Sequence, residues 1–566
     1  MYILGISAFY HDSAACLYRN NTLLGAAEEE RFSGRKGDSS FPKQTIKWLL
    51  QSNGISENDI DVVCWYENPD IKKQRVIETF KRRPLKNLRR IVNHLLEKNE
   101  DSVKSVLSKE LRFSKKIYFV DHHLSHASLA YFTSNFTECN IITVDGVGEK
   151  ETVTISKANG NKIKKLHSIN YPHSLGLFYS AFTAFLGFKP NEGEYKVMGL
   201  ASYGDPSVYY DLIRKTISYT GGNVVIDMRY FSWDYSDSVM FNENLPALLD
   251  VMPRFAEDPL EPHYKHIAAS VQKIYEEILI DLVKFSYELN NSDNLCLGGG
   301  CAYNGVANAQ ISLKTDYKEV WVPLSPSDGG SAIGACLHYI NMAKRWKRKG
   351  PFDAYQGPSF SAQEIEDSIK HFSGRILYEY MDPTDLILRC SNLLNEGNVL
   401  GWFQGRMEFG ARALGNRSII ASPLFPGMQD RINSVIKKRE MFRPFAPSVT
   451  LESANKFFET NGAVPYMNMV VKVKSGWDLP AITHIDGTAR VQTVTSYENP
   501  RFYRLLKTFE DLSGYPILLN TSFNFKDQTI TLYPKDAIIR FLDSEMDFLV
   551  LGNYLISKHD KDQSSK

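Results

Sequence analysis

The feature that most constrains the fold is a set of short apolar runs, each strand-like and each ending in a turn of small and polar residues. Two pairs of these runs predict β-hairpins. The pairs are residues 2–7 with 23–28, around a turn that contains His11, and residues 140–145 with 151–156, around Gly146 and Gly148. Helical stretches separate the runs, and this alternation predicts an α/β domain.

A third run, at 294–297, leads into three glycines and a helix that we expect to begin near Ala302. Farther along, Asp328 and two glycines precede a helix that reaches about Asn341. Two hairpin turns combined with a strand, a glycine loop and a helix are the parts with which the actin-like ATPase fold surrounds a nucleotide. The sequence therefore predicts an actin-like N-terminal domain.

The chain is too long for one hydrophobic core, because single cores stop growing at about 250 to 300 residues and this chain has 566. A basic stretch with proline and glycine, at 343–360, is where we place the domain connection. A second α/β unit should follow, since Ser361 and Glu364 form a capping box and a strand is expected at 399–403. The predicted domains are residues 1–350 and 351–566.

Composition excludes several classes of protein. The 66 Lys and Arg residues are balanced by 65 Asp and Glu, so the net charge needed to grip a long nucleic acid is missing. The longest apolar run, at 174–188, is interrupted by two glycines and is shorter than the roughly 20 residues of a membrane span. Without a signal-like start, a cytoplasmic protein is expected. Seven scattered cysteines without a CxxC pair predict neither a disulfide framework nor a zinc ribbon.

Residues 72–90 are the most basic segment, with nine basic residues and one acid. A docking surface for an acidic partner would carry this charge, but we favour a solvated helix pair broken at Pro84. The tail from residue 558 is polar and is expected to be disordered.

Histidines and aspartates form the first candidate site. His122 and His126 are four residues apart on a predicted helix, so both imidazoles can reach one metal ion. A structural role in hydrogen bonding explains this spacing equally well. Asp145 and Asp328, each at a glycine turn after a strand, favour the metal, and two His with two Asp suit iron(II), manganese or zinc. His11 lies in the first hairpin turn, where it would accept a proton or bind its own backbone.

Cationic residues in the second domain form the other candidate site. They are Arg406, Arg412, Arg417, Lys437, Lys438, Arg439 and Arg443. Arg490 follows at a glycine turn, and Ser522 and Asn524 end an apolar run. Such groups can neutralise a triphosphate together with a second phosphorylated substrate. The alternative is a set of salt-bridged surface arginines, which we consider less favoured because neighbouring acids are few.

Ordered segments along nearly the whole chain resemble the O-carbamoyltransferases of the nodulation-factor and antibiotic-tailoring type, the NodU/CmcH family. The segments are GISAFYHDSAACL, EEERF, FVDHHLSHA, VDGVGE, YKVMGLASYG, LGGGCAYNGVAN, SPSDGGSAIGA, WFQGRMEFGARALGNRSI, FRPFAPS, HIDGTARVQ and LLNTSFN. The resemblance implies an N-terminal domain like the metal-bearing tRNA threonylcarbamoyl transferase and a C-terminal YrdC-like α/β domain that forms an acyl adenylate.

The resemblance also implies roles for individual residues. The metal, usually iron in such proteins, would be held by His122, His126, Asp145 and Asp328. ATP and carbamoyl phosphate would be bound by Lys437, Arg443, Arg490, Ser522 and Asn524, and the adenylate would be approached by Gly299, Gly300 and Asn304. Arg412 also belongs to the expected nucleotide site, although Ala411 precedes it where the family pattern leads us to expect proline.

The function implied by the resemblance is a two-stage O-carbamoyl transfer. Carbamoyl phosphate and Mg·ATP would give carbamoyl adenylate, with Lys437 and Arg443 as the catalytic cations. The carbamoyl group would then pass to a hydroxyl of a small molecule, with His11 as the base. Alternatives are a threonylcarbamoyl transfer to tRNA, which the charge balance disfavours, and a nucleotide-sensing protein without catalysis. We expect no nucleic-acid or membrane partner; a homodimer and the identity of the acceptor are left open.

Overall fold

The structure is a computed structural model of the chain and describes residues 1–82, 100–236, 238–343, 352–460 and 462–559. Three predicted segments fall partly outside the described residues. They are the basic segment beyond residue 82, which includes Pro84, the centre of the predicted domain connection at 344–351, and the tail from 560. The first half of the basic segment is helical, as expected, in α3 (Pro69–Arg82).

The chain divides into two compact units. Unit 1 comprises residues 1–29 and 37–352, and unit 2 comprises residues 30–36 and 353–566. The division near residue 352 lies close to the expected boundary after residue 350. Residues 30–36, which we expected in the first domain, pack with unit 2 instead.

Unit 1 contains two five-stranded mixed sheets with the same topology. The first has the order β3-β2-β1-β4-β5 and consists of β1 (Tyr2–Ser7), β2 (Ala14–Arg19), β3 (Thr22–Glu28), β4 (Ile60–Trp65) and β5 (Lys116–Phe119). The second has the order β12-β11-β6-β7-β8 and consists of β6 (Glu138–Val144), β7 (Glu151–Asn159), β8 (Lys162–Asn170), β11 (Asn294–Gly298) and β12 (Glu319–Trp321). In each sheet three strands form an antiparallel meander and two more add in parallel. The α/β class is confirmed, and the duplicated topology was not visible as a repeat in the sequence.

The first predicted hairpin is wrong in its pairing. β1 pairs with β2, residues 14–19, and the run near 23–28 is the third strand, β3, which pairs with β2. The error arose because two turns occur where one was expected. Asn20, with a φ of 56°, lies in a second tight turn between β2 and β3, and left-handed asparagine is typical of such turns. The second hairpin, β6 with β7, is confirmed.

Helices α6 (His122–Thr133) and α13 (Asp328–Met342) pack against each other, and each also packs on one of the two sheets of unit 1. Small residues allow their close approach. A Cβ atom at Gly334 would lie 2.0 Å from the Ser125 carbonyl oxygen, so no larger residue fits at this crossing. The two helices thereby bring their N-terminal ends to the same part of unit 1.

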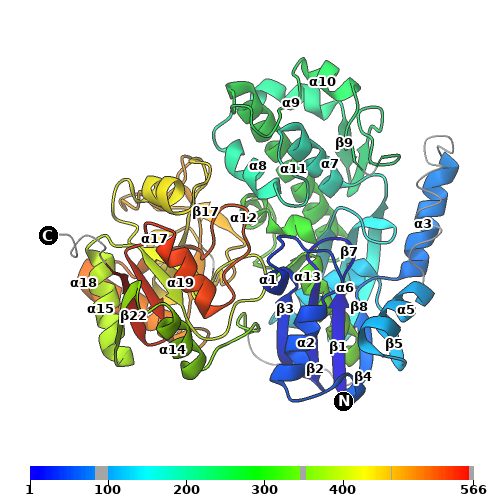
Figure 1. Cartoon of the computed structure of the whole chain (residues 1–566). Coiled ribbons are helices and arrows are strands. Elements are labelled where there is room, and N and C mark those ends of the chain that lie inside the picture. Colours follow the sequence, from blue (N-terminus) through cyan, green and yellow to red (C-terminus); the bar gives the residue numbers. More distant parts are fainter. Residues whose placement is uncertain (83–99, 237, 344–351, 461, 560–566) are drawn as a thin grey trace. The chain divides into compact units, whose positions relative to one another are not determined.

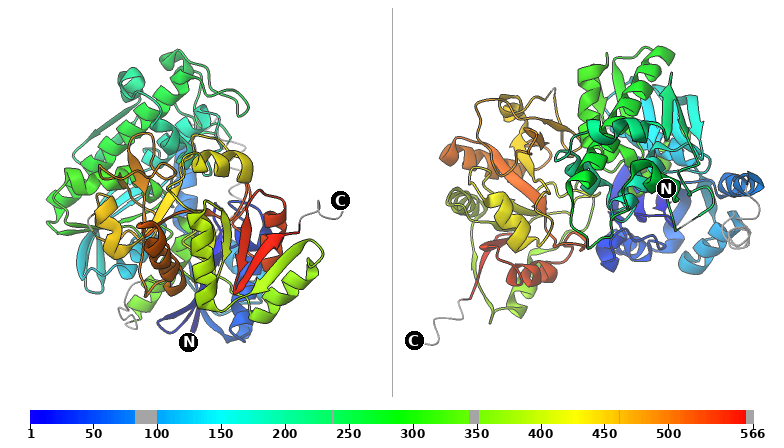
Figure 2. Two further views of the ribbon diagram at one scale, coloured as in Figure 1. Left: turned by 90° about the vertical axis from the view of Figure 1, so that its left-hand side faces the viewer. Right: turned by 90° about the horizontal axis from the view of Figure 1, so that it is seen from above.

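The other helices of unit 1 lie around these sheets. They are α2 (Lys43–Ser52), α5 (Glu100–Leu111), α7 (Leu175–Phe185), α8 (Glu194–Ala201), α9 (Ser207–Arg214), α10 (Asn244–Leu249), α11 (Pro262–Leu289) and α12 (Gly305–Lys314), with a small ribbon of β9 (Ile217–Thr220) and β10 (Asn223–Ile226). Figures 1 and 2 show α7 to α11 gathered together, and the long α11 packs against α7, α8 and α9. Among the described residues, no helix has the length and apolar character needed to cross a membrane.

Unit 2 is built on one eight-stranded mixed sheet of the order β13-β22-β21-β14-β15-β20-β16-β19. Its strands are β13 (Ile376–Tyr380), β14 (Leu400–Phe403), β15 (Arg417–Ala421), β16 (Ala446–Thr450), β19 (Gln492–Val494), β20 (Ile517–Ser522), β21 (Phe548–Leu551) and β22 (Tyr554–Lys558). The helices are α1 (Glu30–Ser33), α14 (Ala362–His371), α15 (Pro383–Asn395), α16 (Met428–Asp430), α17 (Leu451–Phe457), α18 (Pro500–Ser513) and α19 (Pro534–Leu542), and β17 (Val470–Lys472) pairs with β18 (Thr488–Arg490).

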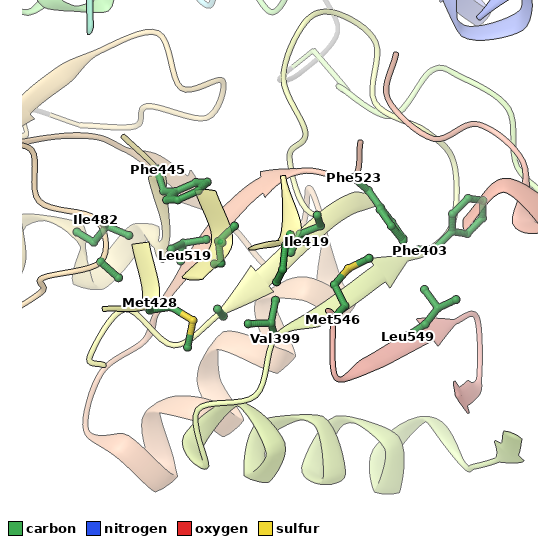
Figure 3. Packing of buried hydrophobic residues seen from close by; sticks show 14 of the residues in the cluster. Val399, Phe403, Ile419, Met428, Phe445, Ile482, Leu519, Phe523, Met546 and Leu549 are labelled. Carbon is green, nitrogen blue, oxygen red and sulfur yellow. The ribbon is translucent and has the colours of Figure 1, made fainter. Parts of the chain in front are cut away.

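Side chains alternate between the two faces of this sheet, and each face contributes to its own hydrophobic core. In β15, Ile419 faces one core and Ile420 the other, as the two-residue period of a strand requires. Helices α14 and α19 cover the first core, part of which is shown in Figure 3, and α15 and α18 cover the second. The predicted capping box of Ser361 and Glu364 at the start of α14 is confirmed.

Candidate active sites

Four buried side chains converge in unit 1. Suitable donor atoms of His122, His126, Asp145 and Asp328 all lie within 4.8 Å of one another, so together they could hold a metal ion. The two histidines are one turn apart on α6, Asp145 follows the last residue of β6, and Asp328 is the first residue of α13. The packing of α6 on β6 brings Asp145 to the two histidines, and the packing of α6 on α13 brings Asp328 to them from a distant part of the sequence. The predicted convergence of these four residues is thus observed.

The donor atoms point at a common centre. The Nε2 atoms of His122 and His126 are 3.0 Å apart, and each lies within 3.0 Å of the same Asp145 oxygen. Both Nε2 atoms are 3.5 Å from Oδ1 of Asp328. Neither carboxylate oxygen of this residue has a hydrogen-bond partner among the described residues, although the side chain is buried. Buried carboxylate oxygens without a hydrogen-bond partner fit a site that binds a cation.

The histidines and aspartates at the centre favour each other's charged forms. Burial alone would lower the pKa of His126, but the carboxylates of Asp145 and Asp328 raise it to about 9. Burial would raise the pKa of Asp145, but hydrogen bonds from the two histidines hold it well below its usual range. The carboxylates are therefore anionic and attract positive charge, from protons or from a metal ion.

Hydrogen bonds with neighbouring groups hold His122 and His126 in position. Ser331 lies 3.0 Å from Nδ1 of His126, which leaves Nε2 for the centre. The buried carboxylate of Glu149 accepts hydrogen bonds from the backbone N–H of His122, at 2.8 and 3.1 Å, and of Asn68, at 2.6 Å. A Cβ atom at Gly148 would lie 3.0 Å from the His122 ring, so the loop after β6 sits directly on the start of α6.

His11 lies at the edge of the same centre. Its Nε2 is 3.9 Å from Asp328, and its Nδ1 is 3.0 Å from Asp12, whose carboxylate would accept the Nδ1 proton. Burial alone would lower the pKa of His11, but the carboxylates of Asp328 and Asp12 outweigh this effect and raise the pKa to about 10. Tyr10 packs on the imidazole, with ring centroids 4.7 Å apart. The structure thus places His11 beside the four ligands, and its role as a base stays a prediction.

The glycine loop after β11 lies against Asp145. Gly299 has a φ of 85°, and a Cβ atom there would come within 2.2 Å of the Val144 carbonyl oxygen, so this position needs glycine. A Cβ atom at Gly300 would be 3.3 Å from Asp145. The helix expected near Ala302 begins at Gly305, where Asn304 accepts a hydrogen bond from the N–H of Ala307.

Asn304 also exchanges two hydrogen bonds with Gln272 of α11, at 3.0 and 3.1 Å. Its observed contacts are therefore structural, and the predicted approach of Gly299, Gly300 and Asn304 to an adenylate stays a prediction.

Unit 2 contains a buried lysine among neutral oxygens. Lys437 is 2% exposed, and its Nζ lies 2.6 Å from the Ser522 carbonyl and 3.1 Å from Oδ1 of Asn524. The Ser522 hydroxyl donates to the same Asn524 oxygen at 2.6 Å. The structure thus brings together three predicted residues that are up to 87 positions apart.

Burial, together with nearby positive charges, holds the pKa of Lys437 well below its usual range. The charged neighbours are Arg439, Arg443, Arg540 and Lys36. Arg540 of α19 donates to the carbonyl oxygens of Phe523 and Thr529 at 3.1 and 3.0 Å, and Glu440 lies 3.7 Å from Arg443. Cations gathered around a buried lysine make a site that favours an anion.

Two arginines of the predicted cationic cluster have structural contacts instead. Arg417 is fully buried on the Phe403 ring and donates to the carbonyl oxygens of Asn416 and Gly405. Arg406 donates to the carbonyl oxygens of residues 356 and 357. Arg417 thus binds the backbone of the loop between β14 and β15, and Arg406 binds the segment that precedes α14. Arg412 lies in that loop and Arg490 ends β18, and their binding roles stay predictions.

Sequence reasoning did not select Arg540, Lys36 or Glu149 as site residues. Arg439, two positions after Lys437, belongs to the predicted cationic cluster, but nothing in the sequence distinguishes it from its neighbours. Arg540 resembles an ordinary exposed charge on an amphipathic helix, and Lys36 precedes the rest of the site by some 400 positions. Only the folded chain shows that these charges act on one lysine.

Comparison with known proteins gives two family matches. Residues 2–337 match the model described as Carbamoyltransferase N-terminus, and residues 391–558 match Carbamoyltransferase C-terminus. An uncharacterised protein of Synechocystis sp. is 40% identical over 98% of this chain and 97% of its own. The nodulation protein NolNO of Sinorhizobium fredii is 35% identical over 98% of this chain and 80% of its own.

A relative with a named reaction is the 3'-hydroxymethylcephem-O-carbamoyltransferase of Amycolatopsis lactamdurans, 29% identical over 56% of both chains. Among solved structures, component A of (R)-2-hydroxyglutaryl-CoA dehydratase from Acidaminococcus fermentans aligns with a TM-score of 0.32 and 12% identity, over 61% of this chain and 99% of that one.

Proposed function

Because the chain belongs to the carbamoyltransferase family and is therefore an enzyme that transfers a carbamoyl group to an acceptor, we propose that it works in two stages, one in each unit. The observation that carries this proposal is the presence of two different sites: a buried lysine with partly buried cations near it in unit 2, and a His and Asp centre in unit 1. We assign the first to activation with ATP and the second to transfer. The proposal includes an actin-like fold for unit 1 and a YrdC-like fold for unit 2.

Activation in unit 2 uses the charges around Lys437. Phosphate leaves carbamoyl phosphate by reaction with water, and an oxygen of the resulting carbamate displaces pyrophosphate from the α-phosphorus of Mg·ATP. The products are carbamoyl adenylate, phosphate and pyrophosphate. Both leaving groups gain negative charge, which Lys437, Arg439 and Arg443 stabilise. The oxygens of Ser522 and Asn524 hold the Lys437 ammonium group in place.

Transfer in unit 1 uses the centre of His122, His126, Asp145 and Asp328. Their mixed N and O donors suit iron(II) or another divalent transition metal, which when bound would supply Lewis-acid polarisation of the carbamoyl carbonyl. The acceptor hydroxyl attacks the carbamoyl carbon, and AMP leaves with the electrons of the broken bond. Asp12 accepts a hydrogen bond from Nδ1 of His11. A cation held by Asp328 and Asp145 would lower the pKa of His11, which these carboxylates otherwise raise, and Nε2 of the neutral imidazole would then take the hydroxyl proton.

A hydroxyl of a small molecule, such as a sugar or natural product, is the acceptor that we propose. The name of the Amycolatopsis relative describes O-carbamoylation of a hydroxymethyl group, which supports an alcohol as the nucleophile.

The test of the proposed function is exchange of labelled pyrophosphate into ATP, which reports reversible adenylate formation. We expect exchange that requires carbamoyl phosphate, in a preparation whose elemental analysis shows one transition metal per chain. Exchange that is absent, or equally fast without carbamoyl phosphate, would contradict the adenylate route. A fully active preparation without a transition metal would contradict the role of the His and Asp centre.

A further inference from the structure

Residues 30–36 belong to unit 2, although the chain on both sides of them belongs to unit 1. Two contacts anchor this segment. The buried guanidinium of Arg31 donates to the Gly410 carbonyl at 2.8 Å. Phe32 packs against a small apolar cluster of Met407, Ile530 and Leu532. Residues 30–36, which lie near the start of the chain, are thus part of unit 2.

Part of the anchor of this segment lies in the loop that also builds the cationic site. Ile530 and Leu532, which hold Phe32, follow directly on the stretch that carries Asn524. Arg540 ties that stretch down by donating to the carbonyl oxygens of Phe523 and Thr529. The segment is therefore seated on the same loop as the Lys437 site.

Lys36 is four residues beyond Phe32 and is half-buried. It is one of the positive charges that lower the pKa of Lys437, after Arg439, Arg443 and Arg540. The cations near Lys437 thus come from residues 437–443, from α19 and from the segment that Phe32 seats on Ile530 and Leu532.

We propose that Lys36 is a further anion-binding residue of the unit 2 site and that its ammonium group contacts a phosphate group of the phosphorylated substrate. This inference rests on the proposed function of unit 2. An ammonium group at this position adds a charge-assisted contact to the phosphate. The activation site is then formed from two distant parts of the chain, and residues 353–566 alone lack one of its cations.

Isothermal titration of the full chain tests the inference, with ATP in one arm and inorganic phosphate in the other. We expect Lys36→Ala to weaken binding at least tenfold in one or both arms, and Lys36→Arg, which keeps the charge, to restore most of the affinity. Lys43→Ala is the matched control, because Lys43 lies seven positions farther on and pairs with Glu110 in unit 1. Melting curves confirm that each variant is folded.

The outcomes separate this inference from the proposed function. If the wild-type chain binds neither ATP nor phosphate, or if Lys437→Ala leaves both affinities unchanged, the proposed anion site is wrong and the role of Lys36 is wrong with it. If Lys437→Ala weakens binding but Lys36→Ala does not in either arm, the site stands and the role of Lys36 is overturned. A Lys36→Arg variant as weak as Lys36→Ala would also overturn it, since charge would then not be what residue 36 contributes.

Discussion

At the residue scale, the buried Lys437 is in a protonation state that depends on its ligand. Burial and four positive neighbours hold its pKa well below its usual range in the free protein. A bound phosphate group favours the charged ammonium and must raise this pKa. Binding of the anion is therefore coupled to uptake of a proton.

We predict that ATP binding takes up protons at pH values above the pKa of Lys437 in the free protein, and that affinity falls as pH rises through this range. The sign follows from the pKa, which is lower without the anion than with it. Titrations in two buffers with different heats of ionisation measure the number of protons. Lys437→Met should abolish the uptake, whereas Lys535→Met, at an exposed position on α19, should retain it. Proton release on binding would contradict the assignment.

The low pKa of Lys437 should also make the stability of the free protein depend on pH. An unfolded lysine has a pKa of about 10.4, so the unfolded chain binds more protons than the folded chain between the two pKa values. Stability therefore rises with pH in that window, because neutral Lys437 is easier to bury than the charged form.

Glu149 should be a positioning residue for the proposed metal ligands, since its carboxylate accepts the first N–H of α6. We predict that Glu149→Gln weakens binding of the transition metal by about 10- to 100-fold, the range for residues that orient a ligand. Competition with a chelator measures the affinity. Glu151→Gln is the control, because the Glu151 side chain pairs with Lys165 instead. Equal affinities of the two variants would contradict this role.

At the scale of elements, the glycine loop after β11 is required by backbone geometry. Gly299→Ala would place a Cβ atom 2.2 Å from the Val144 carbonyl oxygen, at a φ of 85°. We predict a loss of at least about 1 to 3 kcal/mol in stability, measured as a lower melting temperature of unit 1. Gly374→Ala should be tolerated, since nothing lies within 4 Å of a Cβ atom there and its φ is not positive. Equal melting of the two variants would contradict the prediction.

Elements with a local signal could be predicted from the sequence. The hairpin of β6 and β7, the helix that carries His122 and His126, and the capping box at Ser361 depend on neighbours a few residues apart. β2 was missed because only Asn20 and Asn21 separate it from β3, so that a single turn and a single hairpin seemed sufficient.

The parts of the sites that depend on tertiary packing could not be read in this way. The convergence of the four residues of the proposed metal site was predicted because they stand at a strand end, at helix starts or one turn further along a helix. The structural role of Arg417 and the place of Lys36 in unit 2 were not predicted, since arginines and lysines that bind loop carbonyls have the same local pattern as those that bind an anion. Which cations surround the anion site is decided by how the loops fold.

At the scale of the whole molecule, each proposed site is complete within one compact unit, so the two half-reactions should be separable by mutation. Lys437→Ala removes a charge-assisted contact worth about 1.5 to 3 kcal/mol, so adenylate formation should fall at least tenfold. His126→Ala removes a proposed metal ligand in unit 1. It should leave ATP consumption in the presence of carbamoyl phosphate intact while no carbamoylated acceptor accumulates.

Supplied carbamoyl adenylate distinguishes the two variants. The Lys437→Ala chain keeps the His and Asp centre and should form product when given chemically prepared carbamoyl adenylate together with an acceptor, as mass spectrometry would show. The His126→Ala chain should not, because its defect lies after activation. Rescue of both variants, or of neither, would contradict a two-site mechanism. Direct attack of the acceptor on carbamoyl phosphate would then be the better account, since that reaction needs no adenylate and places the whole chemistry in one unit.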